Sequence, residues 1–289
     1  FVKDERLDVL HVHGTGSLPF VILATLGMRH RVKVIFTWQD SERVLKESGW
    51  RRTLMIWAIR RCASVSGSCR KVADQLRMGA GLRDVGIFHG GVPLIPMRAT
   101  HSDRSPGVLW LGRVGPPKDP HAVIRAAREL RRAGLEFSVT LVGKPIASTE
   151  WYFKESQELV SSLGLDQVVR MPGFVPDSAM EELHARSQIG VQTSHTEGLS
   201  IALMEQMMAG FAIVATDVGD TNCAIEHERN GLLIPPKDDE ALVEALRRLI
   251  VDPELRQRLG QAARETAIRK FSLEAMTERA LQEYVRVTK

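Results

Sequence analysis

The stretch GVLWLGRVGPPKDPHAVIRAAREL, residues 107–130 of this chain of 289 residues, contains the clearest pattern of secondary structure in the sequence. The apolar run Gly107–Gly112 predicts a buried strand, and a turn rich in glycine and proline follows it. Asp119 is a favourable N-cap with Pro120 at the first helical position, and the apolar residues that follow recur at helical spacing. A buried strand, a turn and an amphipathic helix form the repeating unit of an α/β fold.

The same unit recurs from residue 107 towards the carboxyl end. Further strands are expected at 137–142, 168–171, 189–193 and 211–215. Helices are expected at 151–163, 177–186, from Ser200 onwards, and at 239–251, 253–269 and 272–287. Strands that alternate with helices predict a parallel sheet covered on both faces, so this part should form a complete Rossmann-like domain.

The first hundred residues contain fewer copies of the unit. Strands are expected at 7–11, 32–37, 63–66 and 85–88, and helices at 18–28, 42–60 and 68–78. The proline-punctuated stretch 93–106 is the best candidate for a linker. We therefore predict Rossmann-like domains at 1–103 and 104–272, with a final helix at 273–289 that packs back on the first domain. Ligands should bind at the carboxyl ends of the parallel strands.

The composition is typical of a folded chain of about two domains. Hydrophobic residues make up 44% and charged residues 26% of the chain, which excludes a disordered or collagen-like protein. The three cysteines exclude a scaffold held by disulfides. The sequence contains no run of eighteen apolar residues, so no membrane-spanning helix is predicted.

Charge is unevenly distributed along the chain. Residues 1–105 carry a net charge of +8, whereas the remaining residues carry −4. A basic first part fits an anionic substrate or an anionic membrane surface, although a chance bias of solvated faces gives the same pattern. No nucleic-acid motif accompanies it, so no nucleic acid is expected as a partner. The stretch 42–61 interleaves basic and apolar residues as an interfacial helix does, although packing of its apolar side on the first sheet is slightly favoured.

A second informative segment is TSHTEGLSIALMEQMMAG, residues 193–210. A strand ends at Thr193, a polar turn follows, and a helix begins at Ser200. The free N–H groups and the dipole of such a helix start favour a phosphate group. Glu197 lies in the turn and Glu205 lies on an apolar helix face, where a carboxylate needs hydrogen-bond partners. A pair of ribose hydroxyls would supply them, whereas a lone glutamate is more often a partly exposed acid at a helix edge.

Two cations follow the strand that opens the second domain. Arg113 comes directly after its end and Lys118 precedes the next helix, which places both at the carboxyl edge of the sheet. They could neutralise a diphosphate, Arg113 through a bidentate fork and Lys118 as a point charge.

With these motifs the sequence resembles the retaining GT-B glycosyltransferases of family 4. The hallmarks of that family are a GR…K turn, present here as Gly112–Arg113…Lys118, and an E-x7-E motif, present as Glu197…Glu205. Supporting segments in the family's order are HGGV at 89–92, MPGFV at 171–175, AIVATDVG at 212–219 and NGLLIPPKD at 230–238.

The resemblance implies transfer of a sugar from a UDP- or GDP-linked donor to an acceptor in glycolipid, polysaccharide or other glycoconjugate synthesis, with retention at the anomeric carbon. It assigns Arg113, Lys118 and the backbone of Gly198, Leu199 and Ser200 to the diphosphate, Glu205 to the ribose, and Glu197 to the donor sugar. It places the loop of Arg170, Gly173 and Phe174 against the base. No D-x-D triplet occurs, so no metal or other cofactor is expected. The expected location is the cytosolic side, with peripheral contact with the anionic inner membrane face.

Several departures from the family pattern leave alternatives open. The family's histidine after the strand at 32–37 is replaced by Trp38-Gln39-Asp40, and Asp119 stands where glycine is common. His11 and His13 lie on an earlier strand and are more often structural than catalytic. The first strand resembles a middle strand of the usual domain, so the first domain is expected to be incomplete at its start. A nucleotide-binding relative without activity, with a regulatory or scaffold role, is the alternative function; an epimerase is disfavoured by the E-x7-E spacing and the GR…K turn.

Overall fold

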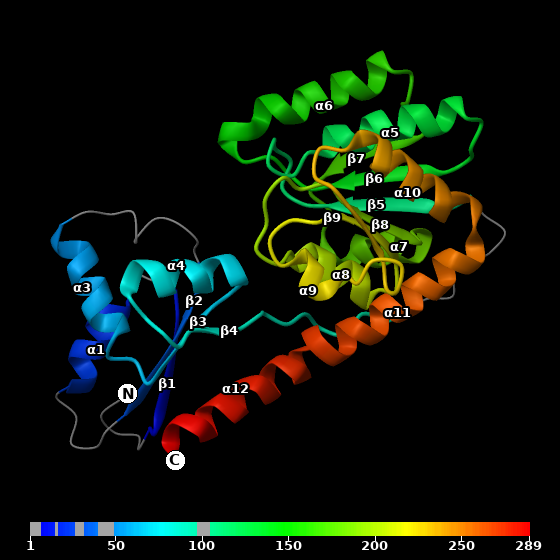
Figure 1. The fold of residues 1–289 in the computed structure, drawn as a ribbon. Helices are drawn as coiled ribbons and strands as arrows, with labels where there is room; N and C mark the ends of the chain where they lie inside the picture. Colours follow the sequence, from blue (N-terminus) through cyan, green and yellow to red (C-terminus); the bar gives the residue numbers. More distant parts are fainter. Residues whose placement is uncertain (1–6, 15–16, 27–31, 40–48, 97–104) are drawn as a thin grey trace. The chain divides into compact units, whose positions relative to one another are not determined.

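The computed structural model describes residues 7–14, 17–26, 32–39, 49–96 and 105–289. The chain divides into two compact units, residues 1–90 with 273–289, and residues 91–272. Each contains one sheet, and all the strand pairs described are parallel (Figure 1). The predicted α/β class with two parallel sheets is therefore confirmed. No helix among the described residues has the length and apolar character needed to cross a bilayer.

The second unit contains a six-stranded sheet in the order β10-β9-β8-β5-β6-β7. Its strands are β5 (Gly107–Leu111), β6 (Ser138–Val142), β7 (Val169–Gly173), β8 (Ile189–Gln192), β9 (Ala212–Thr216) and β10 (Leu232–Ile234). Five of them lie within two residues of the predicted ranges, and β10 was not predicted as a strand.

Helices cover both faces of this sheet (Figure 1). One face is covered by α5 (Pro120–Arg132), α6 (Glu150–Ser162) and α10 (Asp239–Val251). The other is covered by α7 (Asp177–Arg186), α8 (Ile201–Met208), α9 (Thr221–Ala224) and α11 (Pro253–Phe271). Successive residues of a strand point to opposite faces, so Val108 and Trp110 join the first core while Leu109 joins the second. The sheet is buried on both sides, as its apolar strands require.

The first unit contains a four-stranded sheet in the order β1-β2-β3-β4. Its strands are β1 (Val9–His13), β2 (Lys33–Trp38), β3 (Ser64–Gly67) and β4 (Gly86–Ile87), and its first helices are α1 (Leu18–Leu26), α3 (Trp50–Ile59) and α4 (Arg70–Ala80). Within the stretch 42–61, residues 42–48 lie outside the described residues. Met55, Ala58 and Ile59 of α3 are buried in the core, whereas the Trp50 side chain is 71% exposed. The described apolar residues of this stretch thus pack largely inwards, and membrane contact stays a prediction.

The last helix, α12 (Leu273–Thr288), groups with the first unit. Tyr284 places its hydroxyl 3.0 Å from His11 Nδ1, and His11 Nε2 lies 2.8 Å from Thr37 Oγ1. His11 therefore bridges a strand and a helix that are far apart in the sequence, which is a structural role.

The division between the units falls at residues 90 and 91, before the boundary expected at 103–104. Val92 donates its N–H to the Phe271 carbonyl (2.8 Å), and Arg264 donates to the Ile95 carbonyl (2.7 Å). Residues 91–96 therefore belong with the second unit because α11 holds their backbone. The predicted linker residues 97–104 lie outside the described residues.

The half-buried position of His11 predicts a dependence of stability on pH. Burial, with a smaller contribution from His13, lowers the pKa of His11 from 6.5 to about 4. The unfolded chain binds a proton at this residue between those two values while the folded chain does not, so the free energy of unfolding should fall as the pH falls from 6.5 to about 4. Urea titrations of the wild type and of His11→Gln should show a smaller fall for the variant. Equal slopes in the two proteins would contradict the assignment.

Candidate functional site

The candidate site forms where β5 and β8 end side by side. The two strands pair in parallel register, with Val108 opposite Ile189 and Trp110 opposite Val191. After β5 the chain builds the sheet outwards through β6 and β7, and after β8 it builds in the opposite direction through β9 and β10. The loops after such a pair of strands diverge and leave a crevice, which is where open α/β sheets bind ligands.

The turn after β5 carries Gly112, Arg113 and Lys118. Gly112 donates its N–H to the Val142 carbonyl (3.1 Å), which keeps the end of β5 against β6. Gly143 has a φ of +152°, and a Cβ there would lie 1.7 Å from the Gly112 oxygen. This close approach requires glycine. Arg113 then lies exposed at the sheet edge, and the turn closes with a hydrogen bond from Lys118 N–H to the Gly115 carbonyl (3.0 Å).

The turn after β8 carries Glu197, Gly198 and Leu199, and it leads to Ser200 at the start of α8. Ser200 caps that helix by accepting from Leu203 N–H (3.4 Å). The Gly198 carbonyl accepts from Asp220 N–H (2.7 Å), which joins the turn to the end of β9. Glu205 follows in α8 and is half-buried.

Lys118 and Glu197, one from each turn, form an ion pair. Lys118 Nζ donates to Glu197 Oε1, and the same oxygen accepts from Ser194 Oγ (2.8 Å). The side chains are 23% and 10% exposed, so water screens the pair less than it would on an open surface. The two predicted motifs thus meet through their charged side chains, although 79 residues separate them in the sequence.

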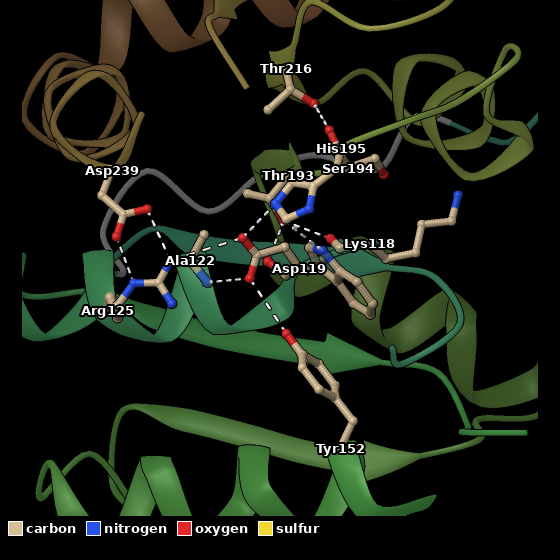
Figure 2. Close-up of polar contacts among 11 residues, drawn as sticks. Lys118, Asp119, Ala122, Arg125, Tyr152, Thr193, Ser194, His195, Thr216 and Asp239 are labelled. Carbon is tan, nitrogen blue, oxygen red and sulfur yellow. Dashed lines mark hydrogen bonds and ion pairs between the residues drawn. The ribbon is translucent and has the colours of Figure 1, made fainter. Parts of the chain in front are cut away.

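Buried hydroxyl groups hold the two turns together (Figure 2). Thr193 Oγ1 donates to the carbonyls of Lys118 (2.9 Å) and Asp119 (2.7 Å), and it accepts from Trp110 Nε1 (3.3 Å). Thr216 Oγ1 donates to the Ser194 carbonyl (2.7 Å). Sequence reasoning did not assign these threonines to the site. Their only signal was a polar residue at the end of a buried strand.

The segment predicted to face the base lies on the edge strand of the sheet. Arg170 is exposed and stands in register with Thr140, within the body of β7 rather than at its end. Gly173 accepts a hydrogen bond from Gly143 N–H (2.9 Å). Phe174 is 68% exposed, and Lys144 Nζ lies 5.5 Å from the centre of its ring. Arg170 and Phe174 are therefore separated from the Lys118–Glu197 pair by β6.

In the first unit, Gln39 directly follows β2, in the stretch 37–40 where the family pattern has a histidine. Its Nε2 donates to His13 Nδ1 (3.4 Å), and Asp40 lies outside the described residues. Within the described part of the chain, no group of three or more His, Cys, Asp and Glu side chains could hold a metal ion.

Gly219 lies just after β9 and packs closely against the turn after β8. Replacing it therefore tests how tightly these two segments are packed. Its φ is +59°, and a Cβ added there would lie 2.2 Å from the backbone carbonyl oxygen of Glu197. Gly219→Ala should therefore lower the free energy of unfolding by about 1–3 kcal/mol. Gly164 is a matched control, because its φ is +65° and a Cβ added there would meet no heavy atom within 4 Å. Chemical denaturation should show a smaller loss for Gly164→Ala, and equal losses would contradict the close approach.

Two protein-family descriptions match the sequence. Residues 96–266 match the family described as "Glycosyl transferases group 1", and residues 1–87 match "Glycosyl transferase 4-like domain". The alpha-D-kanosaminyltransferase of Streptomyces kanamyceticus is 31% identical over 60% of this chain, and the chain covers 44% of that enzyme. A glycogen synthase of Mycobacterium tuberculosis is 25% identical over 97% of this chain and 69% of its own length.

A solved structure shares the fold across both units. The Anabaena protein Alr3699/HepE, crystallised in complex with UDP, has a TM-score of 0.82 at 19% identity, with 96% of this chain and 79% of that chain covered. The group 1 match alone covers more than half of the sequence and includes both turns of the site. The chain therefore belongs to the glycosyl transferases group 1 family and has the GT-B fold of two Rossmann-like domains.

Proposed function

We propose that this chain transfers a sugar from a UDP- or GDP-linked donor to an acceptor, with retention at the anomeric carbon, in the synthesis of a glycolipid, polysaccharide or other glycoconjugate. The observation that carries the proposal is the Lys118–Glu197 ion pair at the edge of the sheet where the strand order reverses. A cation and a carboxylate held together at that position provide one group for the leaving diphosphate and one for the sugar.

The diphosphate is assigned to the cationic groups of this site and to the start of α8. Lys118 is paired with Glu197, and a diphosphate with two or more negative charges would compete for its ammonium group. Arg113 is exposed in the same turn after β5 and can add a bidentate contact. The N–H groups at the start of α8 favour an anion through the helix dipole. Fixed cations of this kind stabilise the charge that develops on the departing diphosphate, and no metal is needed for that step.

The other groups of the nucleotide sugar are assigned to the remaining predicted residues. Glu205 would bind the ribose hydroxyls, and the exposed ring of Phe174 with Gly173 would lie against the base, whereas Arg170 lies near the start of β7. Glu197, held by Ser194, would approach the donor sugar. The structures of Anabaena HepE with UDP and with UDP-glucose support a nucleotide-sugar donor, because that protein shares the fold.

The test is a panel of UDP- and GDP-sugars with donor hydrolysis and transfer as readouts. Lys118→Ala should lower kcat/KM by about 10²-fold, because the diphosphate loses a fixed cation in the transition state. Glu197→Gln keeps the size of the side chain and should lower kcat more than it changes KM. Lys154→Ala, which removes an exposed lysine from α6, is the matched control and should leave both constants unchanged.

Unchanged activity in both site variants would overturn the assignment of the site. Thermal stabilisation by UDP or GDP without turnover of any donor would instead show a nucleotide-binding protein without transferase activity.

A further inference from the structure

Asp119, the residue after Lys118, has a backbone conformation that residues other than glycine rarely adopt. Its φ and ψ are 42° and 60°, in the left-handed region. This region is unfavourable for residues with a Cβ, although Asp tolerates it better than most. Such a conformation persists only where the surrounding contacts hold it, so the contacts of this carboxylate identify what holds it.

Three donors from three parts of the second unit surround the Asp119 carboxylate (Figure 2). Ala122 N–H donates to Oδ1 (3.2 Å) as the cap of α5, and the Tyr152 hydroxyl approaches the same oxygen (3.5 Å). Burial, helped by the Asp119 charge, raises the pKa of Tyr152, which keeps its proton available for donation. The third donor is His195 Nε2, which lies 3.0 Å from Oδ2.

His195 comes from the turn after β8 and contacts the turn after β5 twice. Its backbone N–H donates to the Pro117 carbonyl (2.9 Å), and its ring donates to Asp119. The side chains of His195 and Asp119 are 31% and 12% exposed. A helix cap needs only the Ala122 contact, so the bond to His195 performs a task beyond capping.

The bond between Asp119 and His195 also affects the placement of two charged residues close to it in the sequence. Lys118 directly precedes Asp119, and Glu197 lies two residues after His195. Figure 2 shows the Lys118 side chain extending away from the Asp119 carboxylate, which faces His195, Ala122 and Tyr152. The contacts therefore direct the Asp119 carboxylate towards His195, Ala122 and Tyr152, while the ammonium of Lys118 pairs with Glu197 instead.

We propose that Asp119 and His195 form a positioning pair, which ties together the two turns that carry Lys118 and Glu197 and so keeps the Lys118 ammonium placed to receive a nucleotide diphosphate. This inference rests on the proposed function for the identity of the ligand. The pair acts through the backbone: the hydrogen bond between the two side chains ties the turns together, and the charged residues beside it keep their mutual placement without touching the pair themselves.

The experiment compares two replacements of His195 with a control in the same cluster. His195→Leu removes the ring donor, whereas His195→Gln restores an N–H that can reach the carboxylate. Arg125→Gln is the control, because Arg125 lies 3.9 Å from Asp119 Oδ2 but is paired with Asp239 on α10. The dissociation constants for UDP and GDP are measured by calorimetry in each protein. His195→Leu should weaken binding about tenfold, by misplacing Lys118, and the other two variants should stay within about twofold of the wild type.

A double-mutant cycle separates positioning from a general structural effect. If His195 acts through Lys118, His195→Leu should weaken binding less than about twofold in a Lys118→Ala background. A full tenfold loss of affinity in that background would overturn the proposal of a positioning pair. An equal loss of affinity in His195→Gln and His195→Leu would overturn it as well.

A measurement without ligand keeps the pair testable if the proposed function fails. Hydrogen exchange of the free protein should be faster in His195→Leu than in the wild type for both the 112–119 and the 193–200 segments, and it should be restored in His195→Gln. A wild type that binds neither nucleotide would remove the proposed function, whereas unchanged exchange in both segments of His195→Leu would overturn the positioning pair itself.

Discussion

The parallel pairing of β5 with β8 is the contact on which the site depends. It joins the two halves of the second sheet, with Leu109 opposite Gly190, and it sets where both strands stop. Because the chain leaves these strands in opposite directions, no neighbouring strand fills the space above their ends. Close packing keeps the pairing in register: Gly190 carries no side chain, and a Cβ there would lie 2.5 Å from Gln206 Oε1.

The crevice is polar because the two turns satisfy one another's backbone groups. Carbonyls in the turn after β5 have lost their strand partners, and buried carbonyls need donors. The Thr193 hydroxyl and the His195 N–H supply those donors from the turn after β8. The hydrogen bonds that satisfy the backbone are therefore also the bonds that set the distance between Lys118 and Glu197.

Sequence periodicity predicted most of the second unit because its elements are long and clearly bounded. Helix α10 begins and ends at the predicted residues, Asp239 and Val251, since Asp238 caps it and a proline follows shortly after it. Strand β10 has only three residues, too few for a pattern, and its pairing with β9 defines it. The motifs predicted which charges share an edge of the sheet. They could not predict the contact of Asp119 with His195 or of His11 with Tyr284, because these depend on side chains 76 and 273 residues apart.

The two ends of the second unit are hydrogen-bonded neighbours, through Val92 N–H and the Phe271 carbonyl. Because the unit is one continuous segment, recombination between related genes with breakpoints near residues 91 and 272 would exchange it whole. Such an exchange transfers Lys118, Glu197 and the residues that hold them as a group, and it leaves the first unit with both of its own segments. Any ligand preference that the second unit sets can in this way be inherited separately from whatever the first unit recognises.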